Sequence, residues 1–223
     1  MRGRDIKRYS YEFADLFLLF VPWHFPLHNN PNITGASLEA EKAFENQYPA
    51  IYNHLLQYKT GLSNRNKAET GVRYEWYALQ RWGANYWEDF SKQKIVWKRV
   101  GSILRFSYDD TGIMALDSTC FATGKYIKYL VAVLNSKMGK YLMKDSPQTG
   151  TGDLLISVQA IEPLKIPIPT SNTEKLIDEI IDTILDNGND VSYNLVSEID
   201  RKVYNLYNLN DEECSFIESQ QTQ

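Results

Sequence analysis

The chain has 223 residues, 43% of them hydrophobic and 13% aromatic, so it can bury a sizeable core and belongs to the globular class. Its two cysteines and three histidines follow no metal-ligand spacing, which argues against a disulfide scaffold or zinc module and favours a reducing compartment. No signal peptide opens the sequence, and the apolar run at 16–22 is too short to span a bilayer, so we expect a cytoplasmic protein with no membrane partner.

Charge is unevenly distributed along the chain. The net charge is -4, but residues 1–170 hold 21 Lys and Arg against 16 Asp and Glu, a balance of +5, whereas residues 171–223 hold 3 against 12, a balance of -9. A mildly basic body followed by an acidic tail predicts that only the body faces a polyanion, because acidic groups near phosphates weaken binding.

The N-terminal half begins with four cations in eight residues and passes directly into an apolar strand candidate at 11–20. This abrupt start suggests a chain cut from a larger protein. Residues 29–35 are rich in turn formers, and residues 36–57 have helical periodicity with a kink or break at Pro49. The polar segment 58–72 is typical of a surface loop.

The stretch 73–109 alternates cationic and aromatic side chains most densely, with four of the five tryptophans and seven Lys and Arg residues. It predicts a buried strand at 94–99, a turn at 100–102 and a second strand at 103–108. Such a platform can contact phosphates and guanine edges, with aromatic rings packed beneath or stacked on bases. Alternatively, the tryptophans are core residues and the charges a solvated face.

The C-terminal half predicts a strand at 118–123, a helix at 125–141, a glycine turn at 149–152 and a proline-rich edge strand at 161–169. Three helices follow: one with capping-box spacing at Ser171 and Glu174, one at 192–207, and one beginning at Asn210 with Glu213 at capping distance. The predicted fold class is α+β: a mixed or antiparallel sheet with packed helices at 1–170, then a small acidic helical region at 171–223 whose apolar stripes need a partner.

Several segments, in this order and spacing, carry a family resemblance: Arg2–Tyr9, Tyr48–Ile51, Leu62 with Arg65, Trp76–Leu79, Lys94–Trp97, Leu134–Lys137 and Ile166–Pro169. Together they resemble the TaqI-like C-terminal specificity domain over roughly residues 1–170. The resemblance implies the target-recognition part of adenine-specific DNA methyltransferases and fused type II restriction-modification enzymes. A separate methyltransferase domain of the parent would use S-adenosylmethionine on the flipped-out adenine, and Mg²⁺ would be needed if the parent cleaves DNA. The end of the match also resembles type I specificity subunits, where such helices connect domains.

Catalytic motifs are missing from the sequence. The Asn/Asp-Pro-Pro-aromatic tetrapeptide and the glycine-rich loop of amino-methyltransferases do not occur. The nearest fits to a carboxylate-lysine nuclease are Asp5-Ile6-Lys7, which lacks an upstream carboxylate, and Asp200-Arg201-Lys202 on a helix face. The three histidines have no nucleophile nearby. We therefore expect no catalytic centre, metal or cofactor in this chain.

We predict a DNA-binding surface made of cations and one turn. Phosphate contacts are expected from Arg4, Lys7 and Arg8; base or phosphate contacts from Arg65, Lys67, Arg73 and Arg81; and further contacts from Lys98, Arg99 and the turn carrying Thr149 and Thr151. Two other functions stay open: a protein-docking module without DNA contact, and a standalone nuclease. A continuous positive groove would favour DNA, and a large exposed apolar patch would favour docking.

Overall fold

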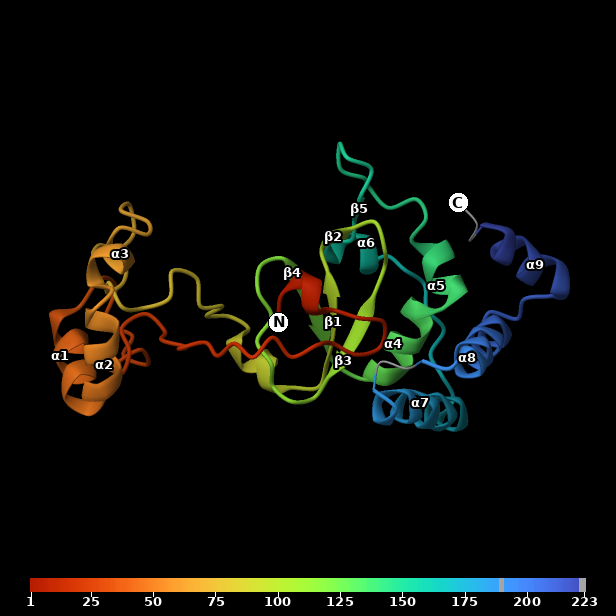
Figure 1. Cartoon of the computed structure of the whole chain (residues 1–223), viewed down its shortest axis with the longest axis horizontal. Helices are drawn as coiled ribbons and strands as arrows, with labels where there is room; N and C mark the ends of the chain where they lie inside the picture. Colours follow the sequence, from red (N-terminus) through yellow and green to blue (C-terminus); the bar gives the residue numbers. More distant parts are fainter. Residues whose placement is uncertain (189–190, 221–223) are drawn as a thin grey trace. The chain divides into compact units, whose positions relative to one another are not determined.

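The computed structural model describes residues 1–188 and 191–220 (Figure 1). The chain divides into two compact units. Unit 1 combines Met1–Asp15 with the chain from Glu88 onward, and unit 2 is Leu16–Trp87. The α+β class predicted from the sequence is confirmed, since small antiparallel sheets are combined with packed helices.

Unit 1 is built on a three-stranded antiparallel sheet in the order β3-β1-β4, formed by β1 (Lys94–Lys98), β3 (Phe106–Asp109) and β4 (Thr119–Thr123). Trp97 of β1 is opposite Phe106 on one side and Cys120 on the other. The predicted strands at 94–99 and 118–123 are confirmed to within a residue. The predicted second strand begins three residues later than expected, and Val100–Gly101 forms its own short strand, β2, where we expected a turn. Trp97 is buried, which fits the core interpretation for this ring.

The N-terminal segment runs along β3. After the 3-10 turn η1 (Gly3–Asp5), the Tyr9 N–H donates to the Phe106 carbonyl at 3.0 Å, and the Tyr9 carbonyl accepts from the Tyr108 N–H at 2.8 Å. The strand predicted at 11–20 is wrong: beyond the isolated bridge between Tyr11 and Ile6 the chain is irregular, because it leaves unit 1 and pairs with no neighbouring strand in the described structure.

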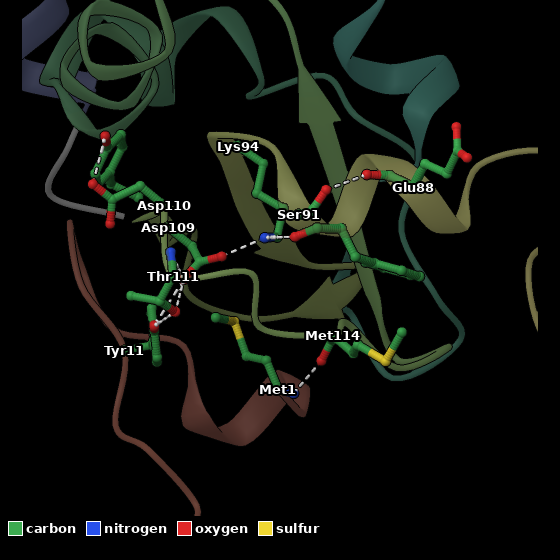
Figure 2. A network of polar contacts seen from close by, with 11 residues as sticks. Met1, Tyr11, Glu88, Ser91, Lys94, Asp109, Asp110, Thr111 and Met114 are labelled. Atoms are coloured by element: carbon green, nitrogen blue, oxygen red, sulfur yellow. Dashed lines mark hydrogen bonds and ion pairs between the residues drawn. The ribbon is translucent and has the colours of Figure 1, made fainter. Parts of the chain in front are cut away.

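A buried ion pair joins β1 to β3 (Figure 2). The Lys94 ammonium donates to the Asp109 carboxylate and, at 2.6 Å, to the carbonyl of Phe90 in η2 (Trp87–Ser91). The other carboxylate oxygen accepts from the Tyr11 hydroxyl at 2.8 Å and the Thr111 hydroxyl at 2.7 Å. Both charged side chains are fully buried, so this pair fixes the sheet, η2 and the N-terminal segment together.

Two short helices, α4 (Ile127–Asn135) and α5 (Lys137–Leu142), replace the single helix predicted at 125–141. The break lies at Ser136, which is extended and caps α5 by accepting from the Gly139 N–H at 3.1 Å. α4 packs on β1 and β3 and is almost entirely buried, with Val131, Ala132 and Val133 inaccessible to solvent.

The C-terminal helices α7 (Ser171–Asp186), α8 (Tyr193–Leu206) and α9 (Asp211–Ser219) pack on α4 and α5 (Figure 1). Ile177, Ile181 and Ile184 of α7 join the same apolar core as the sheet, so the body supplies the partner that these stripes require.

Two details of this C-terminal part differ from the prediction. Thr170, one residue earlier than predicted, caps α7. The edge strand expected at 161–169 is wrong, because its prolines lack N–H donors, and the chain there is unpaired after the short helix α6 (Val158–Ile161). The capping box of Asn210 and Glu213 on α9 is confirmed.

A projecting hairpin contains the glycine turn (Figure 1). Its base is β5 (Leu154–Leu155), which pairs antiparallel with β2, and Gly101 is opposite Leu154. The turn closes with the Thr149 N–H donating to the Asp153 carbonyl at 2.8 Å, and Gly152 has a φ of 84°, where glycine is favoured.

Unit 2 packs α1 (Leu38–Gln47) and α2 (Pro49–Leu56) against the segment 74–78, with the predicted break falling at Tyr48. The predicted surface loop 58–72 begins instead with a short helix, α3 (Lys59–Ser63). Buried Glu75 holds the unit together: it accepts from the backbone N–H groups of His24 at 2.7 Å and Ser37 at 2.9 Å. In the chain as described, no helix is long and apolar enough to cross a bilayer.

Candidate nucleic-acid interface

Two adjoining cavities on unit 1 form what we call the basic groove. The larger, of ≈ 500 Å³, is lined by Lys7, Arg8, Glu12, Ile103, Leu104, Arg105, Lys140 and Val191. The smaller, of ≈ 170 Å³, is lined by Gly3, Arg4, Ile6, Lys98, Gly101, Ser102, Ile103 and Arg105. Ile103 and Arg105 line both cavities, so the two cavities adjoin at these residues.

The groove collects cations from four separate parts of the chain. Six cationic side chains line it against one carboxylate, that of Glu12. Four of the six were predicted, namely Arg4, Lys7, Arg8 and Lys98. Lys7 pairs with Glu12 at 3.1 Å, but both side chains remain partly exposed. A groove lined mainly by one sign of charge concentrates its field and attracts a polyanion.

Arg8 is held in place by its neighbours. Its Nη2 donates to the Asn135 carbonyl at 2.7 Å, and its guanidinium lies 5.1 Å from the centre of the Tyr9 ring. Tyr9 has a φ of 74°, a left-handed backbone that costs a bulky residue about 1–3 kcal/mol. The two backbone hydrogen bonds to β3 hold Tyr9 in this conformation. The turn that carries Lys7 and Arg8 therefore forms at some cost to the stability of the fold. Burial raises the pKa of the Tyr9 hydroxyl to about 12, so the ring stays neutral.

The buried carboxylate of Asp200, on α8, partly offsets the positive charge of the larger cavity. Burial lowers the pKa of Lys140, and Arg8 lowers it further, whereas Asp200 opposes both. Burial also raises the pKa of Asp200, although its Oδ1 accepts from the Lys137 N–H at 2.8 Å. Asp200 therefore reduces the positive potential at Arg8 and Lys140.

Arg105 and Lys140 were not predicted as contacts. Arg105 had a sequence signal: Leu104, Phe106 and Tyr108 alternate with it, and this period of two places Arg105 on the face opposite the buried Phe106. The sequence signal for Lys140 was weaker: this residue lies outside the apolar stripe of the helix that was predicted to end at Tyr141.

The remaining unit 1 candidates lie beside the groove or away from it. Arg99 is exposed after β1 and does not line either cavity; its charge lowers the pKa of Cys120, against the larger effect of burial, which raises it. Thr149 and Thr151 lie in the projecting hairpin, where their hydroxyls are 2.8 Å apart. Because β5 pairs with Gly101 of the groove wall, this hairpin is anchored to the edge of the smaller cavity.

The four candidates of unit 2 are spread over its surface. Arg65 is committed to the fold: its Nε donates to the Leu62 carbonyl at 3.0 Å, and its Nη2 donates to the carbonyls of Trp76 at 2.9 Å and Ala78 at 2.6 Å. Arg73 is exposed and 3.5 Å from Glu69, and Lys67 is exposed. Arg81 lines a separate aromatic cavity. These residues remain predictions as DNA contacts.

Neither nuclease-like triplet forms a metal centre in the described residues. Asp5 is bound by Arg2 through hydrogen bonds of 2.8 to 3.2 Å, and these bonds lower the pKa of Asp5. More broadly, within residues 1–188 and 191–220 no cluster of three or more His, Cys, Asp and Glu side chains is placed to hold a metal ion.

A family model matches most of the chain. The model of the TaqI-like C-terminal specificity domain covers residues 1–168, from η1 to the end of the proline-rich segment. No curated protein matches the chain at a significant level.

Proposed function

Because this chain belongs to the TaqI-like C-terminal specificity domain family, a specificity module of restriction-modification systems, we propose that it recognises a specific sequence of double-stranded DNA. The observation that carries this proposal is the basic groove, which brings Arg4, Lys98 and Arg105 together with Lys7, Arg8 and Lys140. These cations neutralise phosphates and fix the register of the duplex, a step that favours all sequences equally.

Sequence discrimination needs a second set of contacts. We propose that it comes from the projecting hairpin with Thr149 and Thr151, next to the groove, and from Arg81, Lys67 and Arg73 of unit 2. Hydroxyls and guanidinium groups can both read base edges in the major groove.

The chemistry itself belongs to another domain in this proposal. We propose a parent enzyme in which an adenine-specific methyltransferase domain binds S-adenosylmethionine and the flipped-out adenine, with Mg²⁺ at a nuclease centre if the parent also cleaves DNA. The family assignment and the absence of the catalytic tetrapeptide from this sequence support that division of labour.

The test is a selection from a randomised duplex pool, followed by binding measurements with the selected site and a scrambled duplex. The chain should enrich one short motif. The double variant Arg105→Gln/Lys140→Gln should weaken binding to both duplexes by at least about tenfold, since two phosphate contacts are lost. The matched control Lys175→Gln/Lys202→Gln removes two cations from α7 and α8, outside the groove, and should bind normally. Recovery of no motif would refute sequence recognition, and equal binding by both double variants would refute the groove.

A second function, docking of the catalytic domain, is favoured by one observation. Leu16, Phe17, Leu18 and Leu19 at the start of unit 2 are 45–88% exposed, with Phe17 at 88%. Consecutive exposed apolar residues are typical of a protein contact. If this segment docks the methyltransferase domain, Phe17→Asp/Leu19→Asp should weaken their association and leave DNA binding by this chain unchanged; unaltered association would reject it.

A further inference from the structure

Unit 2 contains a cavity of ≈ 270 Å³, separate from the basic groove, which we call the aromatic pocket. Its wall includes Trp23, His24, His28, Gln80, Arg81 and Trp82. The volume lies below the roughly 300–1,000 Å³ of ordinary small-molecule sites. It therefore suits one flat ring system better than a whole nucleotide cofactor.

The wall of the aromatic pocket is rigid. Trp23 donates from Nε1 to the Leu79 carbonyl at 2.7 Å and stacks on Tyr74, with ring centres 5.2 Å apart and planes inclined by 15°. Arg65 binds the carbonyls of Trp76 and Ala78 and so fixes the chain just before Gln80 and Arg81. A site held by such supporting bonds loses little entropy when a ligand binds.

The polar groups of the aromatic pocket include both donors and acceptors. The Nδ1 of His24 lies 3.1 Å from the buried carboxylate of Glu75 and can donate to it. The Nδ1 of His28, another residue of the wall, is buried and has no hydrogen-bond partner among the described residues. Gln80 both donates and accepts, and Arg81 donates.

We propose that the aromatic pocket binds a single nucleobase. Tryptophan rings provide surfaces for a flat heteroaromatic ring, Gln and Arg are the side chains that pair with purine edges, and mixed donors and acceptors match a base edge. A phosphate would require donors only and would meet the carboxylate of Glu75 close behind His24. The proposal rests on the proposed function in one respect: the base is one displaced from the stack of the recognised duplex.

The experiment titrates the whole chain with adenosine, guanosine, cytidine and thymidine, which carry no phosphate, and follows tryptophan fluorescence. Saturable quenching by at least one nucleoside is expected. Gln80→Ala and Arg81→Ala should each weaken it about tenfold, because each removes an edge contact. The matched control Lys42→Ala removes an exposed cation of α1 in unit 2, outside the aromatic pocket, and should leave nucleoside binding unchanged. Thermal unfolding of each variant shows whether it has kept its fold.

Three results would overturn the proposal: no saturable quenching, equal binding by the Gln80→Ala variant, or full competition by inorganic pyrophosphate, which would identify an anion site. The outcome is separable from that for the basic groove. The variant Arg105→Gln/Lys140→Gln should lose duplex binding and keep nucleoside binding. Gln80→Ala should keep binding to scrambled duplex and lose the preference for the selected motif.

Discussion

Cations of one type have different roles in this molecule, depending on whether their donors are already used. Arg105 faces two cavities, whereas Arg65 donates to three carbonyls within its own unit. We therefore assign Arg65 a positioning role: it shapes the segment that leads to Arg81 and would support the base contacts proposed for other residues.

Replacing Arg65 with alanine should lower the free energy of unfolding by about 1–3 kcal/mol, since carbonyls of Leu62, Trp76 and Ala78 lose their donor. Urea denaturation measures this loss. Arg73→Ala should stay within about 0.5 kcal/mol of the unmodified chain, because its ion pair with Glu69 is exposed. A neutral Arg65→Ala variant would contradict the positioning role.

Asp109 should be the most sensitive single carboxylate. Asp109→Asn leaves Lys94 buried without its counter-charge, and breaking a buried pair costs about 3–5 kcal/mol. The double variant Lys94→Met/Asp109→Leu should lose less than the single one, since no charge then stays unpaired. Chemical denaturation of the two variants decides the point, and a larger loss in the double variant would count against it.

The same pair makes stability depend on acid. Burial would raise the pKa of Asp109, but hydrogen bonds from Lys94, Thr111 and Tyr11 outweigh it and hold that pKa below its usual value. The folded state therefore binds fewer protons than the unfolded one. The contribution is complete above the unfolded pKa of about 4 and is lost as pH falls through the lower folded pKa. The pKa of Asp5 is also lowered, so Asp5 makes stability fall in acid in the same way. The part of the slope of unfolding free energy against pH that is lost in Asp109→Asn is therefore the contribution of Asp109.

At the scale of the elements, the junction between α4 and α5 leaves no room for a side chain at Gly139. A Cβ at Gly139 would lie 2.3 Å from the Val133 carbonyl oxygen and 2.6 Å from that of Leu134. Gly139→Ala should destabilise the chain by at least about 2 kcal/mol, even though alanine normally favours helices. Gly61→Ala in α3 is the control: a Cβ there meets nothing within 4 Å, so this change should be neutral or stabilising. Calorimetric melting distinguishes them, and similar melting temperatures would show that the helices can move apart.

α8 should restrain DNA binding through Asp200. Asp200→Asn keeps an oxygen for the Lys137 N–H and removes the negative charge that opposes Arg8 and Lys140 in the basic groove. We expect affinity for scrambled duplex to rise about two- to fivefold at low salt, with the gain shrinking as salt screens it. Glu198→Gln, on the same helix and paired with Lys202, should change affinity little. Fluorescence anisotropy measures both, and weaker binding by Asp200→Asn would reject the restraint.

Periodicity predicted elements better than it predicted their ends. The helical period found α1, α2, α7 and α8 because each buries one apolar stripe. The same reasoning merged α4 with α5, since Ser136 interrupts an apolar stripe that continues on both sides. It also made a strand of 11–20, because apolar composition alone does not reveal that a segment connects two units and pairs with no strand.

At the scale of the whole molecule, the concentration of cations in the basic groove should appear in the salt dependence of DNA binding. If the six cations of the basic groove contact phosphates, the logarithm of the association constant should fall with the logarithm of salt concentration at a slope of about -5. Arg105→Gln should make that slope shallower by about 1. Titrations at several salt concentrations provide the measurement; a slope near zero would exclude phosphate contacts by the groove.

The site was only partly predictable because it is assembled from distant parts of the chain. The N-terminal cations were conspicuous as a cluster in the sequence, and Lys98 lay in the aromatic stretch. Nothing in the sequence showed that Lys140 of α5 would face Arg8, because that proximity depends on how α4 and the N-terminal segment pack against β3. The sequence likewise led to the prediction of Arg65 and not of Arg105 as a contact, since the hydrogen bonds that occupy Arg65 are a property of the fold.

Unit 1 is assembled from two stretches of polypeptide, and unit 2 is the 72-residue segment between them. The basic groove and the aromatic pocket are therefore encoded by separable blocks of sequence. If the basic groove holds phosphates and the aromatic pocket reads a base, as proposed, a recombination that exchanges residues 16–87 between two relatives would alter target preference in a single event and leave the general hold on the double helix intact.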